Sequence, residues 1–277
     1  MPGLSTLLMR PHAADADGCV LEVTPALAHW CYVGFRVLRL LPGQAAMRRE
    51  VGRETCLVVL KGTALISAGG KDLGPVGTRS SVFEDAAPGA VYVPADVGYS
   101  VRAVDPADIA ICTAPGIPNL RAPRIIPPQE MTREVRGQGN NTRYVRNILP
   151  ETRPADSLLV VEVITPGGHW SSYPPHKHDT AGTGETALEE TYYHRIHPDQ
   201  GFAFQRVYTD DRSLDETLCV HDGDLVLVPR GYHPVCAPHG YQVYYLNVMA
   251  GPERKWIARN DPAHDWIVRG PASEASP

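Results

Sequence analysis

Histidines gather in the second half of this 277-residue chain, where nine of the eleven lie between residues 169 and 264. The sharpest group is the string Pro174-Pro-His-Lys-His-Asp179. In an extended segment residues two apart face the same side, so His176 and His178 would point together into one cavity and Lys177 away from it. Histidine is the commonest metal ligand in proteins. The pair therefore predicts half of a metal site.

A carboxylate and a third imidazole follow downstream. Glu190 opens an apolar stretch, and His233 follows the apolar run Leu225–Pro229 after a Gly-Tyr turn. Each residue alone has a plain structural alternative, such as an exposed histidine or a charge at a strand end. Together, three neutral nitrogens and one carboxylate oxygen suit zinc, iron, manganese or nickel. We predict one divalent ion, zinc first and Mn²⁺, Fe²⁺ or Ni²⁺ as alternatives, held by His176, His178, Glu190 and His233.

The elements that must position these residues read as strands. Helical periodicity is scarce, and short apolar runs are bounded by Gly, Pro and Asp, which is typical of antiparallel strands in a sandwich or barrel. The expected strands lie within Trp30–Leu41, Cys56–Leu60, Ala90–Val93, Tyr144–Leu149, Leu158–Ile164, Leu225–Val228 and Val243–Val248.

The two halves also echo each other. Glu54-Thr opens an apolar strand, and Pro94 closes another 40 residues later; Glu190-Thr and Pro229 repeat this pattern at 39 residues. The repeat predicts a duplicated β-domain. It also favours Glu190 over its neighbour Glu189 as the metal ligand, since Glu54 stands in the same Glu-Thr context. We expect an N-terminal domain over residues 1–114, a Pro-rich linker over 115–150 that packs on the second domain, and a C-terminal metal-binding domain over 151–277.

Composition narrows the classes of function. The net charge of −5 and the lack of a basic block argue against nucleic acid as a partner. The first fourteen residues lack an apolar signal core, and no run approaches the roughly 20 apolar residues of a membrane span. We therefore expect no membrane partner and a cytoplasmic location. The six cysteines form no CxxC pair, which favours buried, reduced thiols over disulfides.

The ligand pattern resembles that of the cupin superfamily: an HxH, a downstream Glu, and a Pro-x-Gly turn before a final His. Two departures stand out. The usual three or four residues between the second His and the Glu are replaced by eleven before Glu190, which reads as a loop insertion over Thr180–Leu188. The turn Pro229–His233 is one residue shorter than the usual form.

Longer strings resemble the 5-deoxy-glucuronate isomerase family, bicupin sugar-acid isomerases of myo-inositol catabolism. The resemblance covers essentially the whole chain and implies two tandem antiparallel β-barrel (jelly-roll) domains with few helices. The first half departs from a working cupin, because only Glu54 of the ligand set survives there, and we expect it to be structural. The strings are Trp170–Asp179, Gln200–Asp211, Val228–Pro234 and Tyr244–Gly251.

The resemblance implies an aldose–ketose isomerase that converts 5-deoxy-D-glucuronate to 5-dehydro-2-deoxy-D-gluconate, with a small sugar acid as its partner. Binding the substrate carboxylate calls for a forked cation, and the candidates are Arg206 and Arg143. Tyr244 is our candidate for donating to a sugar hydroxyl or carrying a proton. The other tyrosines beside predicted strands that can fill the same role are Tyr173, Tyr192 and Tyr208.

Several alternatives stay open. The same ligands can hold ferrous iron for a cupin dioxygenase, and a non-catalytic sugar-binding cupin would keep the fold without turnover. Proton transfer and a metal-assisted hydride shift both account for an isomerase, and no residue stands out as the general base. Exposed strand edges of bicupins often pair, so a homo-oligomer, a dimer or a larger ring, is an open alternative for this chain.

Overall fold

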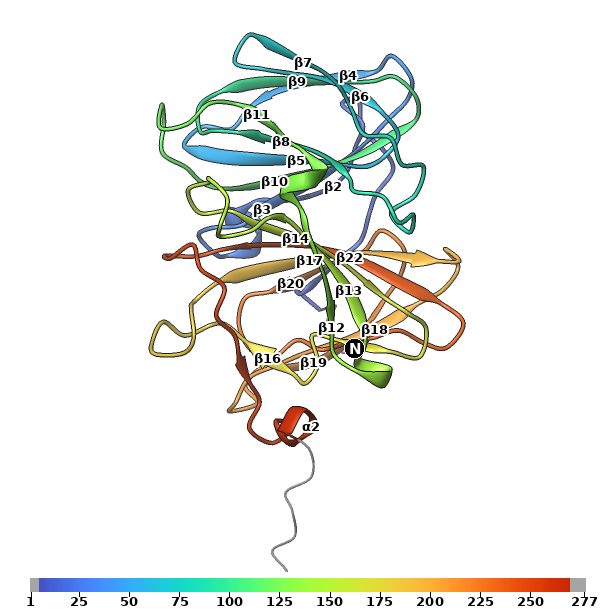
Figure 1. The fold of residues 1–277 in the computed structure, drawn as a ribbon, viewed down its shortest axis with the longest axis vertical. Coiled ribbons are helices and arrows are strands. Elements are labelled where there is room, and N and C mark those ends of the chain that lie inside the picture. The colour runs from blue at the N-terminus through green and yellow to red at the C-terminus, as the bar shows by residue number, and fades with distance from the viewer. Residues whose placement is uncertain (1–4, 270–277) are drawn as a thin grey trace, which may run out of the picture.

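The computed structural model describes residues 5–269, and these fold into two β-barrel-like halves stacked one on the other (Figure 1). Two short helices, α1 (Pro25–Ala28) and α2 (Trp266–Arg269), are the α-helical elements of this range. The expectation of an all-β protein is confirmed. The outer ends of the two expected domains, residues 1–4 and 270–277, lie outside the described residues.

The first half consists of a six-stranded antiparallel sheet in the order β11-β8-β5-β10-β3-β2 and a four-stranded sheet in the order β4-β9-β6-β7. Apolar, β-branched runs such as the one in β5 suit strands that are buried on both faces. The bounds are β2 (Cys19–Val23), β3 (Gly34–Leu40), β4 (Ala45–Arg49), β5 (Arg53–Lys61), β6 (Ala64–Ala68), β7 (Lys71–Val76), β8 (Gly89–Val93), β9 (Gly98–Ala103), β10 (Ala107–Pro115) and β11 (Arg124–Ile126).

The second half pairs a seven-stranded sheet, β1-β20-β17-β22-β14-β13-β12, with a four-stranded sheet, β15-β21-β18-β19, and the two-stranded β16-β23. The bounds are β1 (Leu8–Met9), β12 (Thr132–Arg136), β13 (Arg143–Leu149), β14 (Leu159–Thr165), β15 (Trp170–Ser171), β16 (His176–Lys177), β17 (Glu189–His197), β18 (Ala203–Tyr208), β19 (Asp215–Val220), β20 (Leu225–Val228), β21 (Val235–Cys236), β22 (Gln242–Ala250) and β23 (Arg259–Asn260). Every strand predicted from an apolar run is present.

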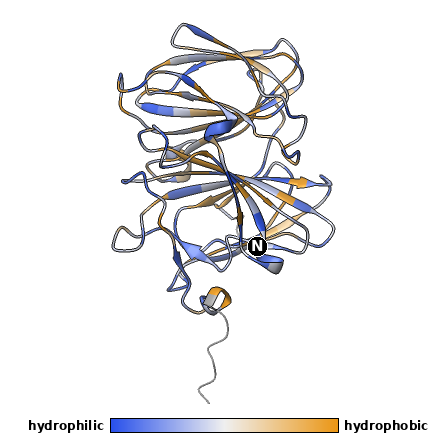
Figure 2. Cartoon of the chain, in the orientation of Figure 1, coloured by the Kyte–Doolittle hydropathy of each residue, from blue (hydrophilic) through white to orange (hydrophobic). Residues whose placement is uncertain are grey.

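Three hydrophobic cores hold the molecule together. One fills each barrel, and the third lies between the two large sheets, where β5 and β10 of the first half meet β17 and β22 of the second. Phe35 and Tyr193 pack across this interface with ring centroids 5.5 Å apart. Hydrophobic colouring accordingly runs along strands in the middle of the molecule (Figure 2). Each large sheet is therefore covered on both faces.

Segments at the chain's start and middle cross between the halves. β1 hydrogen-bonds β20 of the second half. Within the Pro-rich segment, β11 pairs with β8 of the first half, whereas β12 and β13 extend the large sheet of the second. A 3₁₀ turn, Pro128–Glu130, lies between these two attachments. Nowhere in residues 5–269 is a helix long and apolar enough to cross a membrane.

All six cysteines are free thiols. Cys19, Cys56 and Cys112 are buried, as predicted. The expectation of burial is wrong for Cys31 and Cys219, which are exposed because they lie in a loop and on the outer face of β19.

Candidate metal centre

The HxH pair begins in the short strand β16, which holds His176, and His178 directly follows that strand. β16 pairs with β23, which sets His176 opposite Asn260. His178 is buried and faces Glu190, with its Nε2 2.9 Å from Oε2 of that carboxylate. The Lys177 ammonium lies instead with the carboxylates of neighbouring loops, at 2.6 Å from Asp179. The alternation expected of an extended segment is therefore present.

Two further strands bring the other proposed ligands. Glu190 lies near the start of β17, opposite Val228 of β20. His233 follows β20 after a turn at Gly231, which has a φ of +91° and no room for a side chain, since a Cβ would stand 2.4 Å from the carbonyl oxygen of Tyr208. Nε2 of His233 lies 3.2 Å from Oε2 of Glu190. The tight turn thus points the imidazole at the carboxylate.

The structure brings His178, Glu190 and His233 together, with one ligand atom of each within 4.8 Å of the others. All three side chains are buried. His176 borders this group: its ring centroid lies 5.0 Å from that of His233 and 6.4 Å from that of His178. The fourth predicted ligand therefore lies beside the cluster of three.

The donor set fits a divalent cation. Nδ1 of His233 donates to the carbonyl oxygen of Gly231 at 2.8 Å, so its Nε2 carries a lone pair, and that buried atom makes no hydrogen bond. Burial lowers the pKa of His176 and of His233 to about 3, so both rings are neutral. Lone pairs that converge on a buried carboxylate call for a positive charge between them.

His178 differs from the other two rings. Burial lowers its pKa, but the hydrogen bond and the charge of Glu190 outweigh that effect, and the net pKa is raised. Its Nδ1 lies 3.3 Å from the carbonyl oxygen of Leu188. The ring thus shares a proton with the carboxylate through Nε2, and a metal ion would displace this proton, as ligand nitrogens must be deprotonated.

A cavity of about 440 Å³ opens beside His176. Arg143 lines it and is half-buried; its Nη1 donates to the carbonyl oxygens of Asn141 at 3.1 Å and Tyr173 at 3.2 Å. Burial lowers the pKa of Arg143. No carboxylate among residues 5–269 forms an ion pair with it. The predicted candidate therefore lies next to the metal cluster with its charge uncompensated.

The other two candidates from the sequence are not brought to the cluster. Arg206 points outward from β18 and forms a two-pronged ion pair with Asp215, at 2.8 and 2.7 Å. Tyr244 faces the core between the halves, where its hydroxyl donates to Glu162 at 3.1 Å. The reason is strand alternation: neighbours of these residues, not the residues themselves, face the second barrel.

Sequence reasoning missed part of the barrel interior. Tyr245, next to Tyr244, packs its ring 4.8 Å from that of Tyr192. His194 is buried, with Nε2 2.8 Å from Oε1 of Gln205. Alternation along β17 could have found His194, because Tyr192 and His194 lie two and four residues after Glu190 on the same face.

Glu54 is not a remnant metal ligand, which corrects our expectation. Thr55 lies opposite Val93, as Glu190 lies opposite Val228, so Thr55 is the counterpart of Glu190. Glu54 faces the second half instead. Its carboxylate accepts backbone N–H groups of residues 156, 157 and 158 at 2.6–2.7 Å.

Glu189 is the true counterpart of Glu54. Its carboxylate accepts the backbone N–H groups of Cys31, Tyr32 and Val33 at 2.6–2.9 Å. Each half thus offers one carboxylate to a loop of the other, and the repeat read from the sequence was out of register by one residue. The preference for Glu190 as the ligand agrees with the geometry, although the reasoning behind it does not.

Two barrels in tandem, with a buried His/Glu cluster in the second, define a bicupin. Oxalate decarboxylase of Bacillus subtilis has this fold, with a TM-score of 0.65 at 15% identity, covering 94% of this chain and 80% of that one. The sequence model of the KduI/IolB family matches residues 7–267, and the chain belongs to this family.

Similar proteins cover nearly the whole chain. The 5-deoxy-glucuronate isomerase of Geobacillus kaustophilus is 54% identical over 96% of both chains. That of Bacillus subtilis strain 168 is 46% identical over 96% of this chain and 99% of its own. The crystal structure of an IolB-like protein from Salmonella typhimurium LT2 has a TM-score of 0.91 at 48% identity, covering 95% of this chain and 99% of that one.

Proposed function

We propose that this protein is a metal-dependent aldose–ketose isomerase that converts 5-deoxy-D-glucuronate to 5-dehydro-2-deoxy-D-gluconate in myo-inositol catabolism. The observation that carries the proposal is the full-length similarity to proteins named 5-deoxy-glucuronate isomerase, at 46–54% identity. The buried His/Glu cluster beside a cavity lined by Arg143 supports it, because a metal ion would stabilise the reacting oxygens and an arginine would bind the substrate carboxylate.

The proposed metal ligands are His178, Glu190 and His233, completed by His176 from the cavity wall. Zinc is our first choice, with manganese, iron or nickel as alternatives that the same donors accept. A divalent ion held there would act as a Lewis acid toward the carbonyl and hydroxyl oxygens of the substrate. The neutral rings of His176 and His233 keep their lone pairs available at physiological pH.

The chain's own side chains orient the sugar acid. Arg143 offers a charged fork to the substrate carboxylate, and its place beside His176 leaves the aldehyde end to face the cluster. The Tyr192 ring lies 5.6 Å from that of His233, and its hydroxyl is 2.9 Å from Oγ of Ser172. Burial raises the pKa of Tyr192 well above its usual range, so its hydroxyl stays a neutral donor for a substrate oxygen.

The reaction itself is redox-neutral within the substrate. One hydrogen moves from the carbon next to the aldehyde to the aldehyde carbon, and the hydroxyl proton of that neighbouring carbon passes to the former aldehyde oxygen. The aldehyde thereby becomes an alcohol and its neighbour a ketone. The negative charge that develops on the two oxygens needs positive charge and donors in a site that excludes water. A divalent ion held by the buried cluster would supply the positive charge, and the Tyr192 hydroxyl is the donor.

The test is an assay of the purified protein on 5-deoxy-D-glucuronate, with metal analysis before and after chelation. We expect conversion by the metal-replete protein, loss after chelation and recovery when the ion is restored. A metal-replete protein that does not convert the substrate would contradict the isomerase. Oxygen uptake coupled to turnover would favour a cupin dioxygenase instead.

A further inference from the structure

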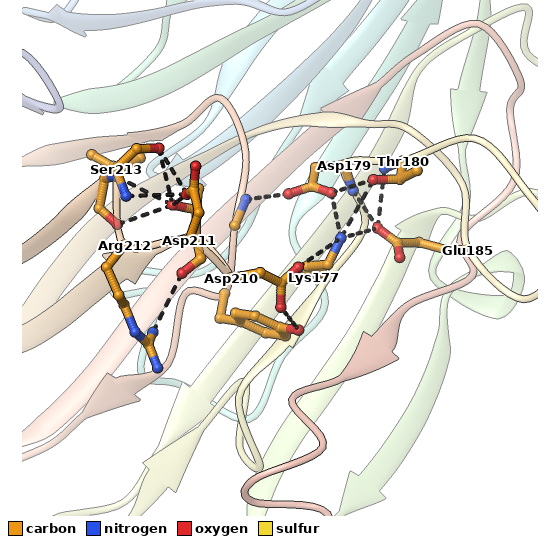
Figure 3. A network of polar contacts seen from close by, with 12 residues as sticks. Lys177, Asp179, Thr180, Glu185, Asp210, Asp211, Arg212 and Ser213 are labelled. Atoms are coloured by element: carbon orange, nitrogen blue, oxygen red, sulfur yellow. Dashed lines mark hydrogen bonds and ion pairs between the residues drawn. The ribbon is translucent and has the colours of Figure 1, made fainter.

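A buried lysine between two proposed ligands is the centre of a polar network (Figure 3). The Lys177 side chain is 6% exposed, and its Nζ lies 2.6 Å from Oδ1 of Asp179 and 3.1 Å from Oε1 of Glu185. Since Lys177 belongs to β16 and points away from its histidine neighbours, the network holds this strand from the side opposite the metal cluster.

Asp179 connects that strand to the turn that carries His233. One carboxylate oxygen accepts from Lys177, and the other accepts the backbone N–H of Gly231 at 2.7 Å. The carbonyl oxygen of Gly231 in turn accepts from Nδ1 of His233 at 2.8 Å. A continuous path of hydrogen bonds therefore joins the two elements that face each other across the cluster.

The insertion and a hairpin close the network. Glu185, in the insertion, is buried and also accepts the backbone N–H groups of Asp179 at 2.8 Å and Thr180 at 3.0 Å. Asp210, between β18 and β19, lies 3.8 Å from Lys177 and accepts the Tyr232 hydroxyl at 2.8 Å. Buried charges must stay paired, so these contacts hold the loops in one arrangement.

We propose that Lys177 and Asp179 are positioning residues that set the separation of His178 from His233 and thereby the affinity of the centre for its metal. Groups that orient metal ligands from behind commonly change metal affinity about 10- to 100-fold when they are replaced. The inference rests on the proposed metal centre, and not on the identity of the substrate.

Two replacements of Asp179 separate its contacts. Asp179→Asn keeps the size and an oxygen for the Gly231 N–H but removes the charge that faces Lys177, whereas Asp179→Ala removes both contacts. Asp215→Asn is the matched control, because it breaks an ion pair of similar length, with Arg206, on the outer face of the same half. The measurements are Co²⁺ affinity by chelator competition, the Co²⁺ absorption spectrum, and thermal unfolding of the metal-free proteins.

We expect Asp179→Asn to weaken Co²⁺ binding about 10-fold and Asp179→Ala more, with altered spectra, while Asp215→Asn binds as the wild type does. If the Asp179→Asn protein folds and keeps the Co²⁺ affinity and spectrum of the wild type, the inference is wrong, although the metal centre itself still stands. If Asp179→Ala does not fold, the Asp179→Asn variant alone provides the test. A wild-type protein that binds no metal would contradict the proposed centre, and the inference with it.

Discussion

Arg143 is half-buried and lines the cavity beside His176. Its guanidinium donates to carbonyl oxygens, and burial lowers its pKa, so the charge is costly where it lies. Arg79, by contrast, is compensated by Glu162 at 2.9 Å. Arg254 also bonds carbonyl oxygens, but it does not line the cavity beside His176. A cost of this kind is offset when an anionic ligand binds, which is the role we propose for Arg143.

Replacing Arg143 tests this role. We expect Arg143→Met to lower kcat/KM on 5-deoxy-D-glucuronate about 10- to 100-fold, mainly through KM, because hydrogen bonds to a charged group contribute about 1.5–3 kcal/mol. Metal content should not change. Arg206→Gln, which alters the exposed partner of Asp215, should stay within about twofold of the wild type. A drop for Arg206→Gln equal to that for Arg143→Met would contradict the assignment.

The neighbours Glu189 and Glu190 point to opposite faces of β17, and their variants should therefore differ in metal binding. Glu190→Gln removes the carboxylate of the cluster, so we expect metal affinity to fall by more than about 100-fold. That is the largest loss usual for residues that only hydrogen-bond to metal ligands. Glu189→Gln should keep the metal, because its contacts are with residues 31–33 of the first half. Metal analysis after dialysis measures both; metal retention by Glu190→Gln would refute the ligand assignment.

At the scale of elements, apolar runs predicted seven strands, among them four of the large sheet of the second half, but not the orientation of their side chains. The apolar runs located β5, β14, β20 and β22, but every residue of β22 after Gln242 is buried, so no alternation of polar and apolar residues marks which face is which. Tyr244 and Tyr245 are equally apolar in pattern and lie on opposite faces. The HxH pair is free of this ambiguity, because two histidines two residues apart in an extended segment must face the same side.

The carboxylate of Glu54, which joins the first half to the second, gives a prediction for stability. Glu54 is fully buried and accepts three backbone N–H groups and the Tyr92 hydroxyl. We expect Glu54→Gln to lower the free energy of unfolding by about 2–3 kcal/mol, since charge-assisted hydrogen bonds are lost. Denaturant unfolding monitored by circular dichroism measures this. Unchanged stability would show that these contacts do not join the halves.

On the scale of the whole molecule, the halves share a core. Residues of β5 and β8 pack with residues of β17, β20 and β22 in one hydrophobic cluster, and β1 reaches from the start of the chain into the second half. Separating the halves would expose this cluster. The sequence predicted the duplication, but not this shared core, because apolar runs do not tell which sheets face each other.

We therefore expect the protein to unfold as one unit despite its two barrels. Calorimetry of the metal-free protein should give a single transition whose calorimetric and van't Hoff enthalpies agree. Tyr193→Ala, which removes a ring that packs on Phe35 across the interface, should lower the stability of both halves together by about 3–5 kcal/mol. Two resolved transitions in the wild type would contradict the shared core.

The one-residue register of the repeat has a consequence for engineering. Each half has a carboxylate that accepts backbone N–H groups of the other half: Glu54 in the first and Glu189 in the second. The next position differs, because it is Thr55 in the first half and Glu190 in the second. A second metal centre built into the first barrel would therefore take its carboxylate at Thr55, whose side chain shares the barrel face with Leu57 and Val59. A design that followed the Glu-Thr repeat and used Glu54 as the ligand would remove the hydrogen bonds between Glu54 and residues 156–158 of the second half.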